Sequence, residues 1–156
     1  MNEVFRRHIE ALRPAYEWLV AAPPFKFTEL AGQSIPDRGI YLLSEGTRHL
    51  YVGRSDNIRR RLKNHCAAGS THLQAAFAFR LTREVCGVPK ATYKPLGSRA
   101  DLMTQGHFRA AFDAQKARLR AMDIRVVKEP DQHRQALLEM YVSIALETPY
   151  NDFANH

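Results

Sequence analysis

The chain has 156 residues, of which 45% are hydrophobic and 25% are charged; this composition is typical of one globular domain and excludes a disordered or fibrous protein. No stretch approaches the ~20 apolar residues that span a bilayer, so we expect no membrane association. Lysine and arginine number 23 against 16 acidic residues, and the formal net charge of +7 favours a polyanion such as nucleic acid as partner.

The first predicted element is an amphipathic helix over residues 2–22. Its apolar residues recur at helical spacing, Pro14 is an expected kink, and Pro23 and Pro24 end it. Charged residues in the first turns distinguish the segment from a signal peptide. The two cysteines fit neither a disulfide framework nor a zinc site, so we expect free thiols and a cytoplasmic protein.

A β-hairpin is the second prediction. Residues 39–44 and 49–53 are short apolar runs, and the turn-forming residues 45–47 separate them. If those three residues form the loop, the register places Tyr41 directly opposite Tyr51. We therefore expect two tyrosines side by side on one face of the sheet.

Directly after the second strand we expect a helix capped by Ser55 or Asp56. With Ile58 as the centre of its buried face, Arg61 and His65 lean toward the protein. A structural salt bridge and a hydrogen-bonded core histidine would explain this placement, and a role in a functional site is the alternative. The outer arc of the helix carries basic residues that are either solvated or in contact with phosphate: Arg59, Arg60 and Lys63.

The second half of the chain is predicted to be mostly helical. Helices are expected over residues 72–81 and 108–122, with a loop-like stretch over 87–106 between them. A short strand over 124–128 and a last helix over 131–146 follow. Repeats and linkers are absent from the sequence, so we expect a single domain over residues 1–156.

The last helix combines a wide apolar stripe with a narrow polar strip. The stripe is expected to be buried and consists of Leu137, Met140, Tyr141 and Ile144, widened by Leu138, Val142 and Ala145. Glu139 lies on the polar strip with Gln132, Gln135 and Ser143. A glutamate in solvent is the ordinary interpretation, and a carboxylate that faces a cleft and binds a divalent metal is the alternative.

The two strands of the hairpin carry a recognisable pair of triplets. Gly39-Ile40-Tyr41 and Tyr51-Val52-Gly53 stand ten residues apart from tyrosine to tyrosine. They resemble the signature of the GIY-YIG nuclease superfamily. Arg61 follows ten residues after Tyr51, His65 follows four later, and Asn57 and Ile58 open the helix as in the family motif.

The resemblance continues near the C-terminus. Leu137-Leu138-Glu139 is similar to the family's glutamate helix, and Asn151 follows twelve residues later within Pro149-Tyr150-Asn151. The resemblance covers about a third of the chain. It implies an α/β (α+β) fold with a small three-stranded antiparallel sheet flanked by helices, in which residues 124–128 are the third strand. Residues 1–37 would be an N-terminal helical extension and residues 66–122 a helical insertion before that strand.

The resemblance also implies an activity, that of a metal-dependent endonuclease acting on DNA. Glu139 would bind one Mg²⁺ or Mn²⁺. Tyr41 would be the general base with Tyr51 as its hydrogen-bonding neighbour, or the reverse. A phenol titrates near 10, so a tyrosine base needs a nearby cation, for which the candidates are Arg54, Arg61 and His65.

Further roles follow from the same resemblance. Arg61 would grip the phosphate, His65 would orient the water or the tyrosine, and Asn151 would tie the C-terminal turn to the site. Arg54 stands where several members of the family have a lysine, and it is also an expected DNA contact together with Arg59, Arg60 and Lys63. Other expected contacts lie on or near the insertion: Arg80, Arg83, Lys90, Lys94 and Arg99.

Two alternatives to a stand-alone nuclease stay open. The first is a nucleic-acid-binding module that keeps the fold without turnover, and the second is an interaction subunit of a repair or restriction system. A homodimer would be required if the protein cuts both strands of a duplex. The sequence leaves the substrate undecided among duplex, branched, nicked or damaged DNA and RNA.

Overall fold

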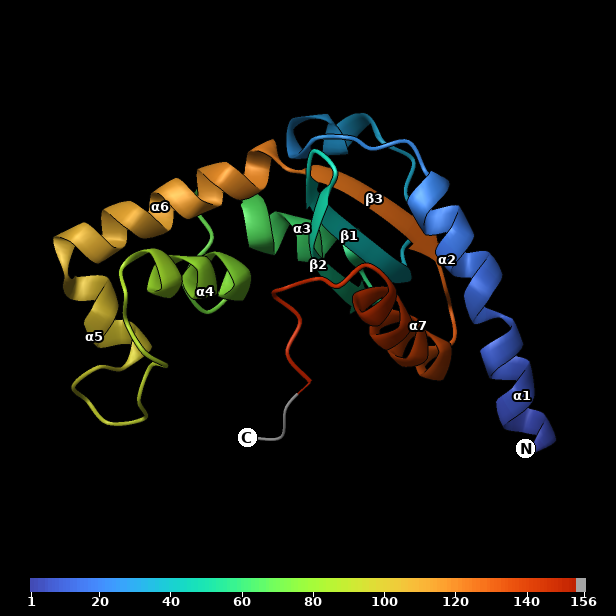
Figure 1. Cartoon of the computed structure of the whole chain (residues 1–156). Helices are drawn as coiled ribbons and strands as arrows, with labels where there is room; N and C mark the ends of the chain where they lie inside the picture. The colour runs from blue at the N-terminus through green and yellow to red at the C-terminus, as the bar shows by residue number, and fades with distance from the viewer. Residues whose placement is uncertain (154–156) are drawn as a thin grey trace. The chain divides into compact units, whose positions relative to one another are not determined.

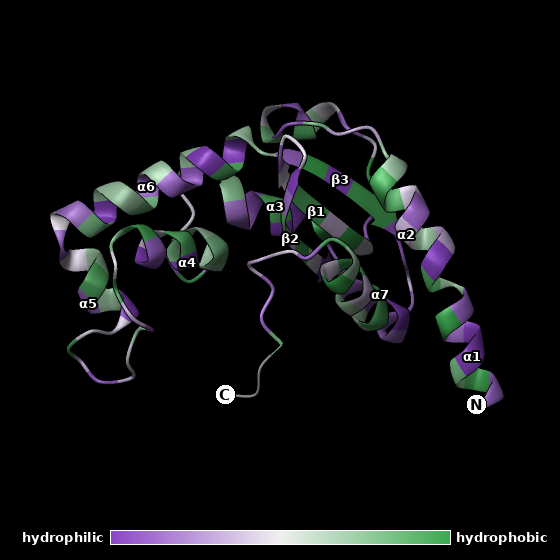
Figure 2. Cartoon of the chain, viewed as in Figure 1, coloured by the Kyte–Doolittle hydropathy of each residue, from purple (hydrophilic) through white to green (hydrophobic). Residues whose placement is uncertain are grey.

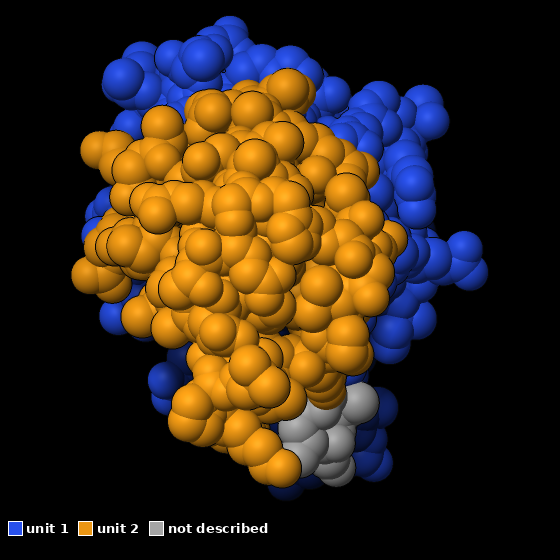
Figure 3. Space-filling view, turned by 90° about the vertical axis from the view of Figure 1, so that its left-hand side faces the viewer, with its two compact units in different colours: residues 1–59, 122–156 blue, residues 60–121 orange. Residues whose placement is uncertain are grey.

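The computed structural model describes residues 1–153 (Figure 1). The chain divides into two compact units (Figure 3). Unit 1 comprises residues 1–59 together with the chain from residue 122 onward, and unit 2 comprises residues 60–121. Unit 2 nearly coincides with the insertion expected over residues 66–122. In the described part of the chain no helix has the length and apolar character needed to cross a membrane.

Unit 1 is built on a three-stranded antiparallel sheet, as predicted. Strands β1 (Gly39–Glu45), β2 (Arg48–Ser55) and β3 (Asp123–Lys128) lie in the order β2-β1-β3 (Figure 1). Gly39 starts β1 with a φ of 152°, and a Cβ at this position would overlap the carbonyl oxygen of Val127 on β3. The first glycine of the motif therefore allows β1 to pair closely with β3.

The register of the hairpin differs from the predicted one. Glu45 pairs with Arg48, so the loop has two residues and not three, and Tyr41 pairs with Gly53 while Tyr51 pairs with Leu43. The expected direct pairing of Tyr41 with Tyr51 is wrong. The shorter loop shifts the register by one residue, and a bulge between Leu43 and Ser44 shifts it by one more. Residues 39–43 therefore slip by two relative to β2 and keep their faces of the sheet. The two tyrosines therefore still share one face.

The helices of unit 1 include two at the N-terminus, α1 (Glu3–Glu10) and α2 (Leu12–Ala21). The break lies at Ala11, because Pro14 has no N–H to donate to the carbonyl of Glu10 and its ring crowds that carbonyl. A short 3₁₀ helix, η1 (Phe27–Gly32), follows, and the sequence analysis did not predict it.

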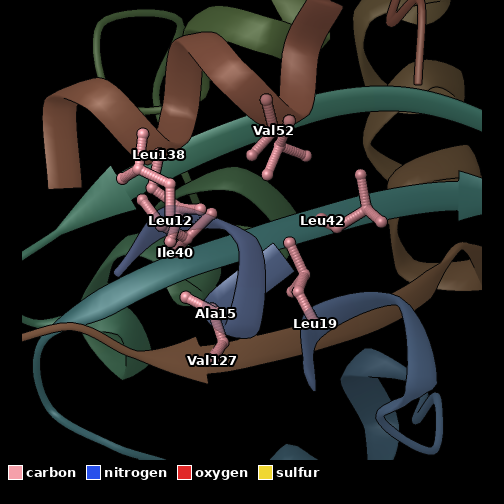
Figure 4. Packing of buried hydrophobic residues seen from close by; sticks show 9 residues of the cluster. Leu12, Ala15, Leu19, Ile40, Leu42, Val52, Val127 and Leu138 are labelled. Carbon is pink, nitrogen blue, oxygen red and sulfur yellow. The ribbon is translucent and has the colours of Figure 1, made fainter. Parts of the chain in front are cut away.

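The core of unit 1 lies between one face of the sheet and the helices α2 and α7 (Gln132–Ala145). Figure 4 shows its side chains, which converge from β1, β2, β3 and both helices. Figure 2 shows β1 and β3 as mainly hydrophobic. The buried members are Leu12, Ala15, Leu19, Ile40, Leu42, Val52, Val127, Leu138 and Val142.

Helix α7 buries a different face from the predicted one. Met140 and Ile144 of the expected buried stripe are exposed, by 44% and 69%, whereas Gln135 and Ser143 of the polar strip are buried. Both buried polar side chains have partners: the Gln135 amide donates to the carbonyl of Glu129, and the Ser143 hydroxyl is hydrogen-bonded to Thr148. Because these polar groups are satisfied, their burial carries no large penalty. The buried face of α7 therefore combines Leu138 and Val142 of the apolar stripe with part of the polar strip, of which Gln132 is exposed.

Unit 2 is helical. It contains α4 (Ala76–Val85), α5 (Arg99–Thr104), α6 (Gly106–Ala121) and most of α3 (Ile58–Cys66), whose first two residues belong to unit 1. Phe79 anchors its core, with ring centroids 5.3 Å from Phe108 and 6.4 Å from Phe112. The helix predicted over 72–81 begins four residues later, and α5 lies within the stretch that was expected to be a loop.

Candidate functional site

The tyrosines of the two motif triplets lie against each other. Tyr41 on β1 and Tyr51 on β2 have ring centroids 6.1 Å apart, with an interplanar angle of 48°. Tyr41 is fully buried, and Tyr51 is partly exposed. The expected pairing of two phenols on one sheet face is confirmed, although it arises from a diagonal contact and not from directly opposed residues.

Gly53 makes room for the first of these phenols. Tyr41 and Gly53 are partners across the hairpin, and a Cβ on Gly53 would overlap both the ring and the hydroxyl of Tyr41. The last glycine of the motif is thus a packing requirement of the tyrosine on the neighbouring strand. The absence of a side chain at Gly53 leaves the space that the ring of Tyr41 occupies.

Strand β2 also holds an ion pair with helix α7. The Nε of Arg54 donates to Oε2 of Glu139 over 3.0 Å. The Glu139 side chain is only 17% exposed, whereas Arg54 is 49% exposed. The alternative in which Glu139 points freely into solvent is therefore wrong: the carboxylate lies at the junction of α7 and β2.

The C-terminal turn runs along the outer edge of β2. Asn151 accepts a hydrogen bond from the backbone N–H of Val52 at 2.9 Å and donates from Nδ2 to the Val52 carbonyl at 2.7 Å. The N–H of Tyr150 donates to the carbonyl of Leu50 at 3.2 Å. Asn151 therefore satisfies two backbone groups of an edge strand that would otherwise need other partners. This contact agrees with the expected role of tying the turn to the site.

Arg59 has a structural function. Its guanidinium donates to the carbonyls of Leu30 and Gln33, at 2.5 Å and 2.7 Å, and so anchors η1 to the start of α3. These contacts within unit 1 occupy both terminal nitrogens, so the expected phosphate contact by Arg59 does not agree with its geometry.

The other expected site residues of α3 belong to unit 2. His65 is fully buried with its ring perpendicular to that of Phe77, at 6.4 Å between centroids, and Arg61 is partly exposed. Burial, reinforced by the positive charge of Arg61, lowers the pKa of His65 to about 3. His65 is therefore neutral at pH 7, and the idea that it supplies a cation for a tyrosine base is wrong. Arg60 and Lys63 are exposed, as the helical phase predicted.

Within unit 1 the candidate residues gather around β2. Side chains alternate along a strand, so Tyr51 and Gly53 lie on one face of β2, and Val52 and Arg54 lie on the other. The tyrosine pair and the ion pair start from opposite faces of this strand. Since β2 is an edge strand, both faces adjoin its outer edge, where Asn151 is bound.

Glu139 is the one candidate metal ligand among the expected site residues. Over residues 1–153 no group of three or more histidine, cysteine, aspartate or glutamate side chains is arranged to bind a metal. Glu139 is a lone carboxylate, and one of its oxygens accepts from Arg54. Mg²⁺ commonly binds through one or two carboxylates and completes its shell with water and substrate phosphate. Glu139 therefore fits one ion shared with a substrate, and does not fit a pre-formed protein cage.

Sequence reasoning missed two residues that support the site. Thr148 is buried, and its hydroxyl donates to Oδ1 of Asn151 at 2.8 Å, which orients the amide toward β2. The amide of Gln135 donates to the carbonyl of Glu129 and to Asp56, just before α3. The sequence feature that could have identified Thr148 is its position three residues before Asn151. For Gln135 the feature is its place on the same polar strip as Glu139.

Comparison with known proteins gives one match. The family model of the GIY-YIG catalytic domain matches residues 38–89, a segment that contains both motif triplets, Arg61 and His65. Glu139 and Asn151 lie outside the matched segment. No curated protein and no solved structure matches the chain.

Proposed function

Because residues 38–89 make this chain a member of the GIY-YIG nuclease superfamily, we propose that it is a metal-dependent endonuclease that hydrolyses phosphodiester bonds in DNA. The observation that carries the proposal is the contact between Tyr41 and Tyr51, together with the ion pair that Arg54, on the opposite face of β2, forms with Glu139 of α7. Phenol, guanidinium and carboxylate are groups suited to proton transfer, phosphate binding and metal coordination.

A tyrosine acts as general base in this proposal. Its phenolate removes a proton from water, the water oxygen attacks phosphorus, and the bond from phosphorus to the 3′ oxygen breaks as that oxygen takes up a proton. We assign the base to Tyr41, with Tyr51 as the hydrogen-bonding neighbour, and the exchanged assignment is the alternative. An unperturbed phenol has a pKa near 10, so the base needs a cation. A guanidinium is the cation best suited to that role. Arg61 is the proposed one, because Arg54 extends from the opposite face of β2 to Glu139.

The remaining residues bind and position the substrate. Arg61 presents a fixed fork of donors that suits bidentate contact with the scissile phosphate. Neutral His65 orients the water or the base through its ring nitrogens. Asn151 positions the C-terminal turn against β2, and the exposed cations contact the DNA backbone: Arg54, Arg60 and Lys63.

Glu139 is the proposed ligand of a single divalent ion, Mg²⁺ or Mn²⁺; members of this superfamily are generally metal-dependent. Such an ion, when bound, neutralises charge on the phosphate and assists the leaving oxygen. Arg54 donates to the same carboxylate. Its guanidinium would have to move aside, and a substrate phosphate offers it another acceptor.

The decisive experiment compares the wild-type protein with Glu139→Gln on supercoiled plasmid and on labelled linear and branched DNA at low salt. Glu10→Gln, the same chemical change at an exposed position of α1, is the matched control. We expect cutting that requires Mg²⁺ or Mn²⁺ and stops with EDTA. Loss of the ligand should lower the rate at least about 100-fold, with DNA binding retained. Tyr41→Phe and Tyr51→Phe, measured alongside, decide which phenol is the base.

A second readout separates metal binding from turnover. Titration with Mn²⁺ in the absence of DNA should show weaker binding to Glu139→Gln than to Glu10→Gln. If no substrate is cut and both variants bind DNA as the wild type does, the enzyme proposal fails. The chain would then be a nucleic-acid-binding module or an interaction subunit of a repair or restriction system. Cutting of both strands would require a dimer on DNA, which sedimentation can detect.

A further inference from the structure

The charge of the protein is divided unequally between its two units. Unit 2 contains twelve lysines and arginines and three acidic residues, a net charge of +9. Unit 1, which carries the sheet and the candidate site, contains eleven basic and thirteen acidic residues, a net charge of −2. The positive charge of the whole chain therefore comes entirely from the helical unit.

Asp101 and Asp113 of unit 2 take part in the internal structure of the unit. Asp113 is paired with Lys116, which is buried and also donates to the carbonyls of Ala68 and Ser70. Asp101 accepts from the N–H of Gly97 at the start of α5. Twelve cations against three acids give this unit the excess of positive charge that is typical of surfaces that bind polyanions.

Three guanidinium groups of unit 2 lie close together. Arg80 and Arg83 are one turn apart on α4, and Arg99 at the start of α5 lies over the ring of Phe79, with its central carbon 5.0 Å from the ring centroid. A hydrogen bond of 3.4 Å from Arg99 to the carbonyl of His72 also restrains this side chain. Arg80, Arg83 and Arg99 are called the arginine cluster below.

Arg83 has the least favourable surroundings in the arginine cluster. Its Nε is buried and has no hydrogen-bond partner among the described residues. Burial and the charges of Arg99 and Arg80 lower the pKa of Arg83. A half-buried guanidinium next to two others is unfavourable unless an anion joins them. A buried donor without an acceptor is the feature that a bound phosphate oxygen would satisfy.

We propose that unit 2 is the nucleic-acid-binding unit of the protein and that the arginine cluster is a phosphate site on it. The ligand is a backbone phosphodiester; this identification rests on the proposed function, whereas the preference for a phosphate group rests on the cluster itself. Arg99 is held in place by Phe79, so little side-chain entropy is lost when the phosphate binds.

The test measures the affinity of the full chain for a short fluorescent DNA duplex, in EDTA so that nothing is cut, from about 50 to about 200 mM salt. The variant is Arg80→Gln/Arg83→Gln/Arg99→Gln. The control, Arg6→Gln/Arg7→Gln/Arg13→Gln, removes the same three charges from exposed positions of unit 1 that are paired with Glu3 and Glu17. Each lost phosphate contact lowers the slope of log affinity against log salt by about 0.9.

We expect the slope of the cluster variant to fall by about 2 to 3, and that of the control to stay near the wild-type value. Equal losses in both variants would mean that only net charge matters and would overturn the proposal. An unchanged slope in the cluster variant would do the same.

The single variant Arg83→Gln distinguishes a loss of DNA binding from a loss of folding. It removes a charge from between two like charges, so its midpoint of thermal unfolding should be retained or raised while its DNA affinity falls. A lower midpoint with unchanged affinity would make Arg83 structural and reject its place in the site. Because DNA is not cut in this assay, the outcome is independent of the Glu139→Gln experiment. Removal of the arginine cluster can lower DNA affinity whether or not the protein cuts DNA.

Discussion

At the scale of single residues, Gly53 shows why the motif needs a glycine at its last position. The ring of Tyr41 occupies the space of a Cβ at residue 53, on the partner strand. In Gly53→Ala the phenol would have to leave its position or the strands would have to separate. We expect a loss of about 1–3 kcal/mol in the free energy of unfolding, as for other overpacked sites, measured by urea denaturation.

The matched control is Gly32→Ala, where nothing lies within 4 Å of the new Cβ. This variant should change the stability by less than about 1 kcal/mol. Gly53→Ala should in addition lower nuclease activity more than its stability loss explains, because the displaced phenol is a proposed catalytic group. Full activity in a stably folded Gly53→Ala protein would contradict the assigned role of Tyr41.

Burial of single residues could be predicted from the sequence where it depends only on the phase of the helix that carries them. The helical phase of α3 placed His65 inside and Lys63 outside, and both placements are confirmed. The helical phase could not predict that Arg59 donates hydrogen bonds to the carbonyls of Leu30 and Gln33. Those partners belong to a 3₁₀ helix that carries no strong periodic signal, and they lie almost thirty residues away in the sequence.

At the scale of secondary-structure elements, helix α7 shows the limit of hydrophobic periodicity. Its apolar stripe is wider than the face that is buried, so periodicity alone could not show that Leu138 and Val142 are buried while Met140 and Ile144 are exposed. The hydrogen bonds of Gln135 and Ser143 allow the adjoining part of the polar strip to be buried as well. The three strands were predictable because each is a short apolar run bounded by turn residues, whereas the hairpin register depended on a two-residue turn and on the bulge between Leu43 and Ser44.

The contact between the C-terminal turn and β2 depends on one side chain. Asn151→Ala removes both hydrogen bonds to Val52 and leaves two backbone groups of the edge strand to solvent. We expect the protein to lose about 1–3 kcal/mol of stability, and the amides of Val52 and Asn151 to exchange hydrogen faster. Thr148→Val, which removes the hydroxyl that orients the amide and also bonds buried Ser143, should give a loss in the same direction while both hydrogen bonds to Val52 are retained.

Hydrogen exchange resolved by residue tests this prediction directly. Faster exchange should be confined to β2 and the C-terminal turn, with β1 and β3 unchanged. If Asn151→Ala leaves the exchange of Val52 unaltered, the edge strand does not need this contact, and a role for Asn151 in the site would have to be sought in the substrate complex.

At the scale of the whole molecule, charge and burial make stability depend on pH. The pKa of His65 is about 3 in the folded chain, because it is buried and near Arg61, and near 6.5 when unfolded. Below pH 6.5 the unfolded chain binds a proton that folded His65 does not. The contribution of His65 is therefore fully present above pH 6.5 and is lost as pH falls toward 3.

We expect the free energy of unfolding to fall by about 1.4 kcal/mol per pH unit from His65 alone over most of that window. His49 and His72 add to the slope with the same sign, since burial also lowers the pKa of each. Urea unfolding between about pH 4 and 6.5 should therefore show a slope that His65→Asn reduces by about one proton. His107→Asn, at an exposed position of α6, is the control for replacing an imidazole by an amide. If His65→Asn retained the full slope, the imidazole would already be protonated in the folded protein, and His65 would again be a candidate for the cation beside the tyrosine base.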